Sequence, residues 1–115
     1  MISFYKPGAG DGPPTLFSPG DLVRHKRYHY RGVVVDFNLV CHADEHWYQS
    51  NQTRPDRDQP WYHVLVDGNS ATTYAAQSSL DPDNSGDPVD HPLIGVFFTG
   101  FVDGAHLRND TPWPV

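Results

Sequence analysis

The sequence predicts an all-β fold: a small SH3-like antiparallel barrel of about five strands, with one or two short helical turns. Eleven prolines and ten glycines among 115 residues leave little room for long helices. Three Trp, six Tyr and six Phe stand beside a single Met, so the core has to be aromatic and β-branched. The stretch 61–66 has apolar side chains on both faces, which is typical of a strand covered on both sides in a closed barrel.

The stretch 61–66 is the predicted central strand. It follows Pro60 and ends at Asp67-Gly68, a strong turn signal. Alternation along a strand places Trp61 at the start of one face and Tyr62 at the start of the other. His63 lies within this strand, so we expect a hydrogen-bonded core histidine rather than a catalytic one.

The other predicted elements surround this strand. In chain order we expect a hairpin of residues 22–25 against 31–37, a short helix at 42–51 that turns Cys41 and Trp47 inward, a strand at 72–74, a helical turn at 75–80, an acidic loop at 81–92 and a last strand at 93–102. Gly95 and Gly100 would mark bends or a bulge in the last strand. The predicted core comprises Val33, Val35, Trp61, Val64, Val66 and Phe97.

A chain of this length is expected to form one domain. Residues 1–16 are rich in glycine and proline, so we interpret them as a flexible N-terminal arm before a barrel domain at 17–110 and a tail at 111–115. The single cysteine, Cys41, excludes an intrachain disulfide and favours a buried thiol in a reducing compartment. No secretory signal or membrane-spanning stretch is recognisable, so we expect a cytoplasmic location. The oligomeric state stays open.

The segment His42-Ala43-Asp44-Glu45-His46 matches a short pattern found in some zinc proteases. On a helix, His42 and His46 would share one face and Glu45 would serve as a base. Such enzymes need a further ligand from another long helix, which this chain does not provide. We therefore expect no metal and no cofactor here. The sequence also lacks a phosphate-binding loop and a nucleophile elbow, so an enzyme is disfavoured.

A basic and aromatic bend connects the first two predicted strands. Four of the eight Lys and Arg residues fall within positions 24–31, where tyrosines alternate with them. Such a bend can contact phosphates and stack on bases. The alternative is a solvated turn whose arginines pair with the many aspartates of this acidic chain, which has a net charge of −6. The candidate nucleic-acid-binding residues are Arg24, Lys26, Arg27, Tyr28, Tyr30 and Arg31.

Four blocks occur in a fixed order along the chain. They are Phe17-x-x-Gly20-Asp21-x-Val23-Arg24-His25, Tyr30-Arg31-Gly32-Val33-Val34-Val35-Asp36, Gln59-Pro60-Trp61-Tyr62-His63-Val64-Leu65-Val66, and Thr73-Tyr74 followed by Leu80. Together they resemble the YccV-like family, known as hemimethylated-DNA-binding domains, which includes bacterial heat-shock protein Q. The match covers about residues 17–102. Between the second and third blocks, the family's helical stretch is matched by Asp44, Glu45, Trp47, Tyr48 and Asn51.

The resemblance implies a small β-barrel that binds rather than catalyses. One implied partner is hemimethylated double-stranded DNA, with the basic bend on phosphates and Tyr28 or Tyr30 against the adenine methyl group. The alternative is an adaptor role in ATP-dependent proteolysis, with a protease or its clients as partners. We expect a protein partner to use an exposed aromatic patch of Trp113 with Phe98 and Phe101. The end of the chain resembles members of the family that are fused to F-box modules.

Overall fold

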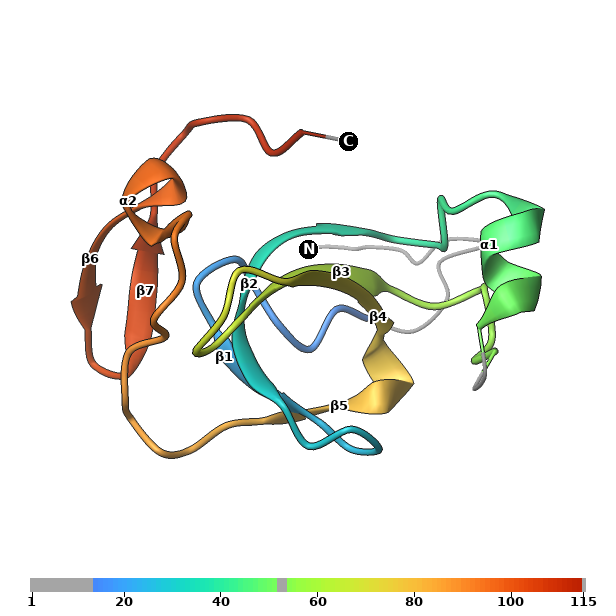
Figure 1. The fold of residues 1–115 in the computed structure, drawn as a ribbon, viewed down its shortest axis with the longest axis horizontal. Helices are drawn as coiled ribbons and strands as arrows, with labels where there is room; N and C mark the ends of the chain where they lie inside the picture. The colour runs from blue at the N-terminus through green and yellow to red at the C-terminus, as the bar shows by residue number, and fades with distance from the viewer. Residues whose placement is uncertain (1–13, 52–53, 115) are drawn as a thin grey trace, which may run out of the picture.

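The computed structural model describes residues 14–51 and 54–114 of the chain. Five antiparallel strands curl around a core to form a small barrel, and a separate two-stranded hairpin packs beside it (Figure 1). The hairpin and the helix α1 lie at opposite ends of the molecule in this view. The predicted all-β, SH3-like barrel with short helical turns is confirmed.

The barrel strands follow the order β4-β3-β2-β1-β5. Their bounds are β1 Leu22–His25, β2 Arg31–Asn38, β3 Trp61–Val66, β4 Thr72–Ala76 and β5 Leu80–Pro82. The predicted central strand, β3, lies between β2 and β4. Every neighbouring pair is antiparallel, and an irregularity between Val34 and Asp36 shifts the register of β2 against β3. A bulge of this kind strengthens the local twist that lets the sheet curl into a barrel.

Three apolar clusters hold the fold together. The barrel interior contains Val34, Tyr62 and Val64, packed with residues of the other strands. On the outer face of the sheet, Val33, Val35 and Leu65 pack against the C-terminal hairpin, while Trp61 and Cys41 form a smaller cluster under α1. The six residues predicted for the core are all buried, with exposed fractions of 5% or less. The outer clusters explain why both faces of β3 are apolar.

The C-terminal region differs from the prediction of one strand at 93–102. It forms a short helix, α2 (Ile94–Phe97), followed by β6 (Phe98–Val102), which pairs with β7 (Ala105–Arg108). The helix begins after Leu93, and Gly95 lies within it rather than at a strand bend. Gly100 does border a register irregularity in the hairpin, as expected. The apolar side chains of α2 and β6 cover the outer face of the sheet. A helical turn followed by a strand therefore buries the same apolar residues that one continuous strand was predicted to bury.

Three other element boundaries require correction. The helix expected at 42–51 is shorter: α1 spans Glu45–Ser50, because Asp44 caps its N-terminus by accepting a hydrogen bond from the backbone N–H of Trp47. Residues 75–80 are divided among the end of β4, a 3-10 turn η1 (Gln77–Ser79) and the start of β5. The expected acidic loop therefore begins later, because Asp81 lies in β5 and pairs with Arg24 of β1.

The predicted domain limits are only partly covered by the described residues. Most of the expected N-terminal arm, residues 1–13, lies outside them, as do residues 52–53 of the polar loop before β3 and Val115 at the end. The described chain starts with Pro14, whose carbonyl accepts a hydrogen bond from the Gln77 side chain. None of the helices in the described part has the length and apolar composition needed to cross a bilayer.

Replacing Trp61 by alanine should destabilise the fold by about 3–5 kcal/mol, because the side chain is completely buried and its loss leaves a cavity. Chemical denaturation monitored by circular dichroism measures this difference. The matched control is Trp47→Ala, since Trp47 is 38% exposed and should cost clearly less. A Trp61→Ala variant as stable as the parent would contradict the role of β3 as the central strand.

Candidate binding groove at the edge of the barrel

The bend between β1 and β2 is shaped by the ring of His25. Its Nδ1 atom accepts hydrogen bonds from the backbone N–H groups of Arg27 and Tyr28, both at 3.1 Å. His29 adopts a positive φ of 62°, which lets the backbone reverse direction within a few residues. The rings of Tyr28 and Tyr30 both stack on His25, with centroids 4.8 Å and 5.1 Å from it. The bend is therefore a preformed aromatic unit.

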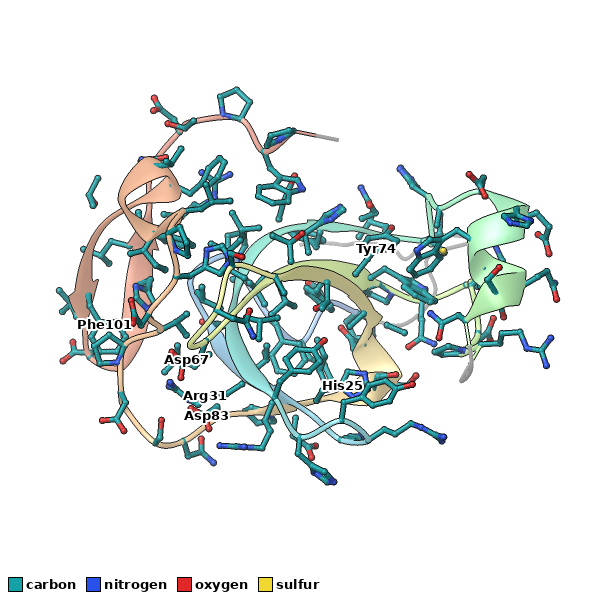
Figure 2. All side chains as sticks on the ribbon, in the orientation of Figure 1. His25, Arg31, Asp67, Tyr74, Asp83 and Phe101 are labelled. Atoms are coloured by element: carbon teal, nitrogen blue, oxygen red, sulfur yellow. The ribbon has the colours of Figure 1, made fainter. Side chains whose placement is uncertain are left out.

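Arg31 does not lie free beside this bend. Its guanidinium pairs with Asp67 at 2.9 Å and with Asp83 at 3.1 Å (Figure 2). Nη2 also donates to the hydroxyl of Ser85 and to the backbone carbonyl of Asp87. The side chain is only 15% exposed. Arg31 thus joins the start of β2 to the turn after β3 and to the acidic loop after β5.

The ion pairs of Arg31 perturb the acids around it. The pKa of Asp67 is lowered first by a hydrogen bond from the backbone N–H of Asp90 and then by Arg31. Burial acts to raise the pKa of Asp83, but the hydrogen bonds that its carboxylate accepts from Ser85 and Arg31 outweigh this effect, so the pKa is also lowered. Both carboxylates are therefore stabilised in their charged form, which keeps the guanidinium of Arg31 engaged within the chain.

The remaining cations of the bend are more accessible. Arg24 pairs with Asp83 at 3.4 Å but its side chain stays 46% exposed. Lys26 lies 3.9 Å from Asp81, and both side chains are at least half exposed. The guanidinium of Arg27 lies over the ring of Tyr28 and forms no ion pair with another described residue. The sequence analysis gave as an alternative that the arginines of the bend pair with aspartates. Arg31 does so completely, whereas Arg24 pairs with Asp83 and stays partly exposed.

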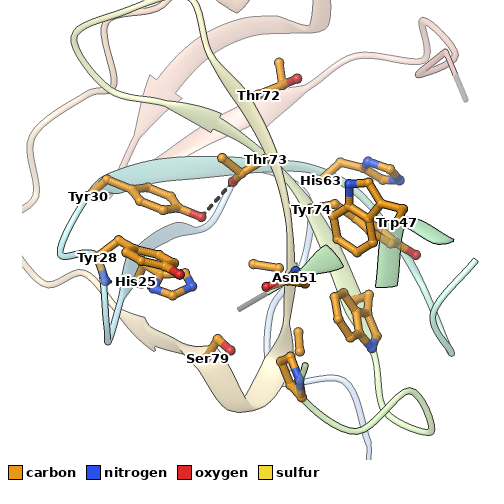
Figure 3. Close-up of a pocket in the computed structure, with 14 residues that line it drawn as sticks. His25, Tyr28, Tyr30, Trp47, Asn51, His63, Thr72, Thr73, Tyr74 and Ser79 are labelled. Carbon is orange, nitrogen blue, oxygen red and sulfur yellow. Dashed lines mark hydrogen bonds between the residues drawn. The ribbon is translucent and has the colours of Figure 1, made fainter. Parts of the chain in front are cut away.

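Beside the bend lies a groove of about 410 Å³, which we call the β4 groove (Figure 3). The strand β4 runs through it, with His25, Tyr28 and Tyr30 on one side and Trp47 and Tyr74 on the other. Its lining also includes Asn51, Pro55, Trp61, His63, Thr72, Thr73, Ala75, Ala76 and Ser79. Among the described residues that line it there is no Asp, Glu, Lys or Arg.

Hydrogen bonds fix the two sides of the β4 groove. The hydroxyl of Tyr30 lies 2.7 Å from that of Thr73, which ties the bend to β4. The hydroxyl of Tyr74 donates to the Asn38 side chain at 2.7 Å and accepts from the backbone N–H of His42 at 3.0 Å. The ring of Tyr74 also stacks on His63. Such anchoring gives a ligand site that is largely formed before the ligand arrives.

The structure therefore separates the predicted nucleic-acid-binding residues into three groups. Arg24, Lys26, Arg27 and Tyr28 are exposed on and beside the bend. Tyr30 turns toward β4, and Arg31 is withdrawn into the acidic loop. The sequence interpretation of the site missed the groove residues Thr72 and Tyr74. Their alternation on a short strand was visible, but the position of that strand at the edge of the sheet depends on the strand order.

The expected aromatic patch of Trp113, Phe98 and Phe101 is not an exposed surface. Phe98 is buried, and Phe101 and Trp113 are partly buried against the outer face of the sheet. Trp113 lies against the rings of Phe97 and His63. The prediction of this patch as a partner surface was wrong because these residues complete the core between the hairpin and the barrel.

The zinc-protease pattern is not assembled into a site. His42 precedes α1, whose first residue is Glu45, so His42 and His46 do not share a helical face. Glu45 instead accepts a hydrogen bond from Gln49 and lies 3.7 Å from Arg57. Within residues 14–51 and 54–114, no three His, Cys, Asp or Glu side chains are grouped in a way that suits a metal ion.

Removing the Arg31 side chain should destabilise the protein by about 2–3 kcal/mol, because it leaves two acids unpaired in a partly buried site. We expect Arg31→Ala to lower the midpoint of urea unfolding accordingly. The control, Arg27→Ala, removes an exposed arginine and should change the free energy of unfolding by less than about 0.5 kcal/mol. Equal effects of the two substitutions would argue against the ion-pair assignment.

Stability should also fall as the pH drops below about 6.5. Burial lowers the pKa of His25, His63 and His106, so the unfolded chain takes up these protons before the folded one does. The stabilisation is complete above the unfolded pKa and is lost as the pH falls toward the lowered folded values. Thermal unfolding at pH 7 and pH 5 measures the loss.

The variant His106→Gln tests one contribution to this pH dependence. His106 Nε2 accepts a hydrogen bond from the backbone N–H of Val89 at 2.9 Å, which a protonated ring cannot do. A glutamine carbonyl accepts without titrating, so the difference in melting temperature between the two pH values should shrink. An unchanged difference would exclude His106 as a contributor.

Comparisons with known proteins bear on the whole domain. A family model described as "Hemimethylated DNA-binding protein YccV like" matches residues 15–105. F-box only protein 21 from Homo sapiens and from Mus musculus are each 29% identical over 98 residues, which is 83% of this chain. The match covers 15% of the human protein and 16% of the mouse protein, so the chain spans less than a fifth of these curated relatives.

The family match agrees with the resemblance found in the four sequence blocks. It covers the five barrel strands, α1, α2 and β6, and ends at the first residue of β7. Because the match includes most of the chain, this protein belongs to the YccV-like family of hemimethylated-DNA-binding proteins.

Proposed function

We propose that this domain is a non-enzymatic protein-binding module and that the β4 groove is its ligand site. The observation that carries the proposal is the composition of the groove: about 410 Å³ lined by aromatic and small neutral residues, in a chain with 22 charged residues among 115. Aromatic side chains with a few polar groups are typical of the central part of a protein interface, where charged residues are depleted.

Charge at the bend supports the same reading. Arg31 has all of its guanidinium nitrogens engaged within the chain, and Arg24 shares Asp83 with it. A duplex approaching the bend would also meet Asp81 and the following acidic loop. Each of these acids opposes the phosphate backbone, whereas a protein ligand can pair with charges of both signs.

DNA binding is the second candidate, and the family description favours it. The exposed tip formed by Lys26, Arg27 and Tyr28 offers cations and a ring for phosphate and base contacts. With Arg24 the bend has three exposed cations, two of which lie near aspartates. A protein that holds DNA through its phosphates can make about 6–10 such contacts. A second surface or a second copy of the chain would have to add the remainder.

The identity of the partner is a further part of the proposal. An ATP-dependent protease or its clients, which the family resemblance implies, would present peptide surfaces of the kind that an aromatic groove accepts.

A cytoplasmic location would be compatible with the buried free thiol of Cys41.

A titration with methylated duplexes distinguishes the two candidates. With fully methylated, hemimethylated and unmethylated DNA, we expect weak binding at low salt, no methylation preference, and loss of binding at moderate salt. Three phosphate contacts give a slope of log affinity against log salt of about −2.7. The matched control replaces Arg24, Lys26 and Arg27 by alanine. A preference for hemimethylated DNA that persists at moderate salt and disappears in this variant would overturn the protein-binding proposal.

A site-specific cross-linker provides the complementary test. Placed at Tyr28, which is 50% exposed beside the β4 groove, it should form adducts with protein in cells. Placed at Val102, which is 53% exposed on the hairpin, it should not. Adducts at Tyr28 that are digested by nuclease and resist protease would support DNA as the partner instead.

A further inference from the structure

The strand β4 has an unpaired edge inside the β4 groove. In the described part of the chain it pairs with β3 and with no other strand. The backbone N–H of Val66 donates to the carbonyl of Ala71, and that of Gln77 donates to the carbonyl of Pro60. Antiparallel pairing alternates, so Thr73 and Ala75 direct their backbone groups toward β3, whereas Thr72 and Tyr74 direct theirs away from it.

The accessible part of this edge is short and well defined. Thr72 is exposed and Tyr74 is partly exposed, whereas Ala75 and Ala76 are buried. The accessible edge thus presents two N–H groups and two carbonyls, from residues two positions apart. This spacing fits the main chain of one added β-strand, in which every second residue offers a matching donor and acceptor.

The surroundings of the edge define the side chains of an added strand. Aromatic rings of Tyr28 and Tyr30 stand on one side and those of Trp47 and Tyr74 on the other (Figure 3). With no charged residue in the described lining, the groove favours apolar or small uncharged side chains.

One end of the groove adjoins two exposed cations of the bend. Tyr28 of the groove wall lies under the guanidinium of Arg27, and Lys26, which lies 3.9 Å from the exposed carboxylate of Asp81, precedes them. An acidic residue on the ligand would meet these cations once its uncharged segment lies against β4. Charge complementarity of this kind sets the orientation of a bound peptide more than its affinity.

We infer that the β4 groove binds an extended segment of a partner protein by β-strand addition to Thr72 and Tyr74. The residues of the segment that lie against β4 are uncharged, and an acidic residue that adjoins them lies beside Lys26 and Arg27. This inference rests on the proposed function and specifies its ligand. A proline-rich helix would use the aromatic walls but would leave the N–H and carbonyl groups of the edge unpaired. An added strand would contact the aromatic walls and would also pair with the N–H and carbonyl groups of the edge.

The variant Thr72→Pro tests the backbone contact. Proline removes the outward N–H of Thr72 without removing a hydrogen bond to β3, a substitution that sheet edges accommodate. The matched control is Thr72→Ala, which shortens the side chain but keeps the N–H. A displayed library of random short peptides is selected on the full chain, and the enriched peptides are synthesised. We expect their affinity to be kept by Thr72→Ala and to fall about tenfold in Thr72→Pro.

A second measurement uses the unmodified protein and does not depend on how Thr72→Pro folds. Each enriched peptide is synthesised with single N-methyl groups at successive backbone positions. Strand addition predicts that alternate positions lose about tenfold or more in affinity, while the positions between them do not. Replacing an acidic residue of the peptide by lysine should weaken binding to the parent and have less effect on an Arg27→Ala variant.

The outcomes separate this inference from the proposed function. Peptides that bind in the β4 groove without alternating N-methyl sensitivity, or proline-rich peptides alone, would overturn strand addition and leave the protein-binding function standing. Self-association of the chain through Thr72 and Tyr74, seen in amide chemical shifts at rising concentration, would make a second copy the occupant and also overturn the inference. No enrichment of any peptide, together with binding of hemimethylated DNA at moderate salt, would overturn both.

Discussion

The pairing of Arg31 with Asp67 and Asp83 is the interaction on which the arrangement of this domain depends. It joins the start of β2, the turn after β3 and the end of β5, which are distant in the sequence. Through Ser85 and the carbonyl of Asp87 it also holds the acidic loop that leads to the C-terminal hairpin. A single guanidinium with five donors in a fixed plane can meet several acceptors at once, which an ammonium cannot do in this geometry.

The same ion pairs change the electrostatics of the neighbouring bend. Arg31 lies in the most basic stretch of the sequence, yet its charge is neutralised by two acids within hydrogen-bond distance. A count of cations along the chain therefore overstates what the surface offers to a phosphate backbone. Arg24, Lys26 and Arg27 remain, and aspartates lie near two of them. For this reason the aromatic groove, rather than the charge of the bend, carries the functional proposal.

Local sequence signals located the strands β1 to β4, but they missed β5 and β7 and could not show which strand keeps an unpaired edge. Alternation and turn residues placed β1 at its observed bounds and identified β3 as an interior strand, which lies between β2 and β4. The C-terminal segment was predicted as one strand because Phe97, Phe98 and Phe101 form an apolar run without a clear period. A helical turn followed by a strand buries the same rings, and only the distant face formed by Val33, Val35 and Leu65 decides between the two. The groove was missed for a related reason, since which strand stays unpaired is a property of the whole sheet.

The shape of the β4 groove depends on His25, a buried histidine of its lining. His25 accepts two backbone hydrogen bonds through one neutral nitrogen, and both tyrosines of the bend stack on its ring. The wall of the groove is therefore positioned from the buried end of β1 and not by the exposed residues of the bend. Substitutions at Lys26 or Arg27 can change the charge beside the groove while its aromatic wall keeps its place. This separation allows charge and shape to be tested independently in the same site.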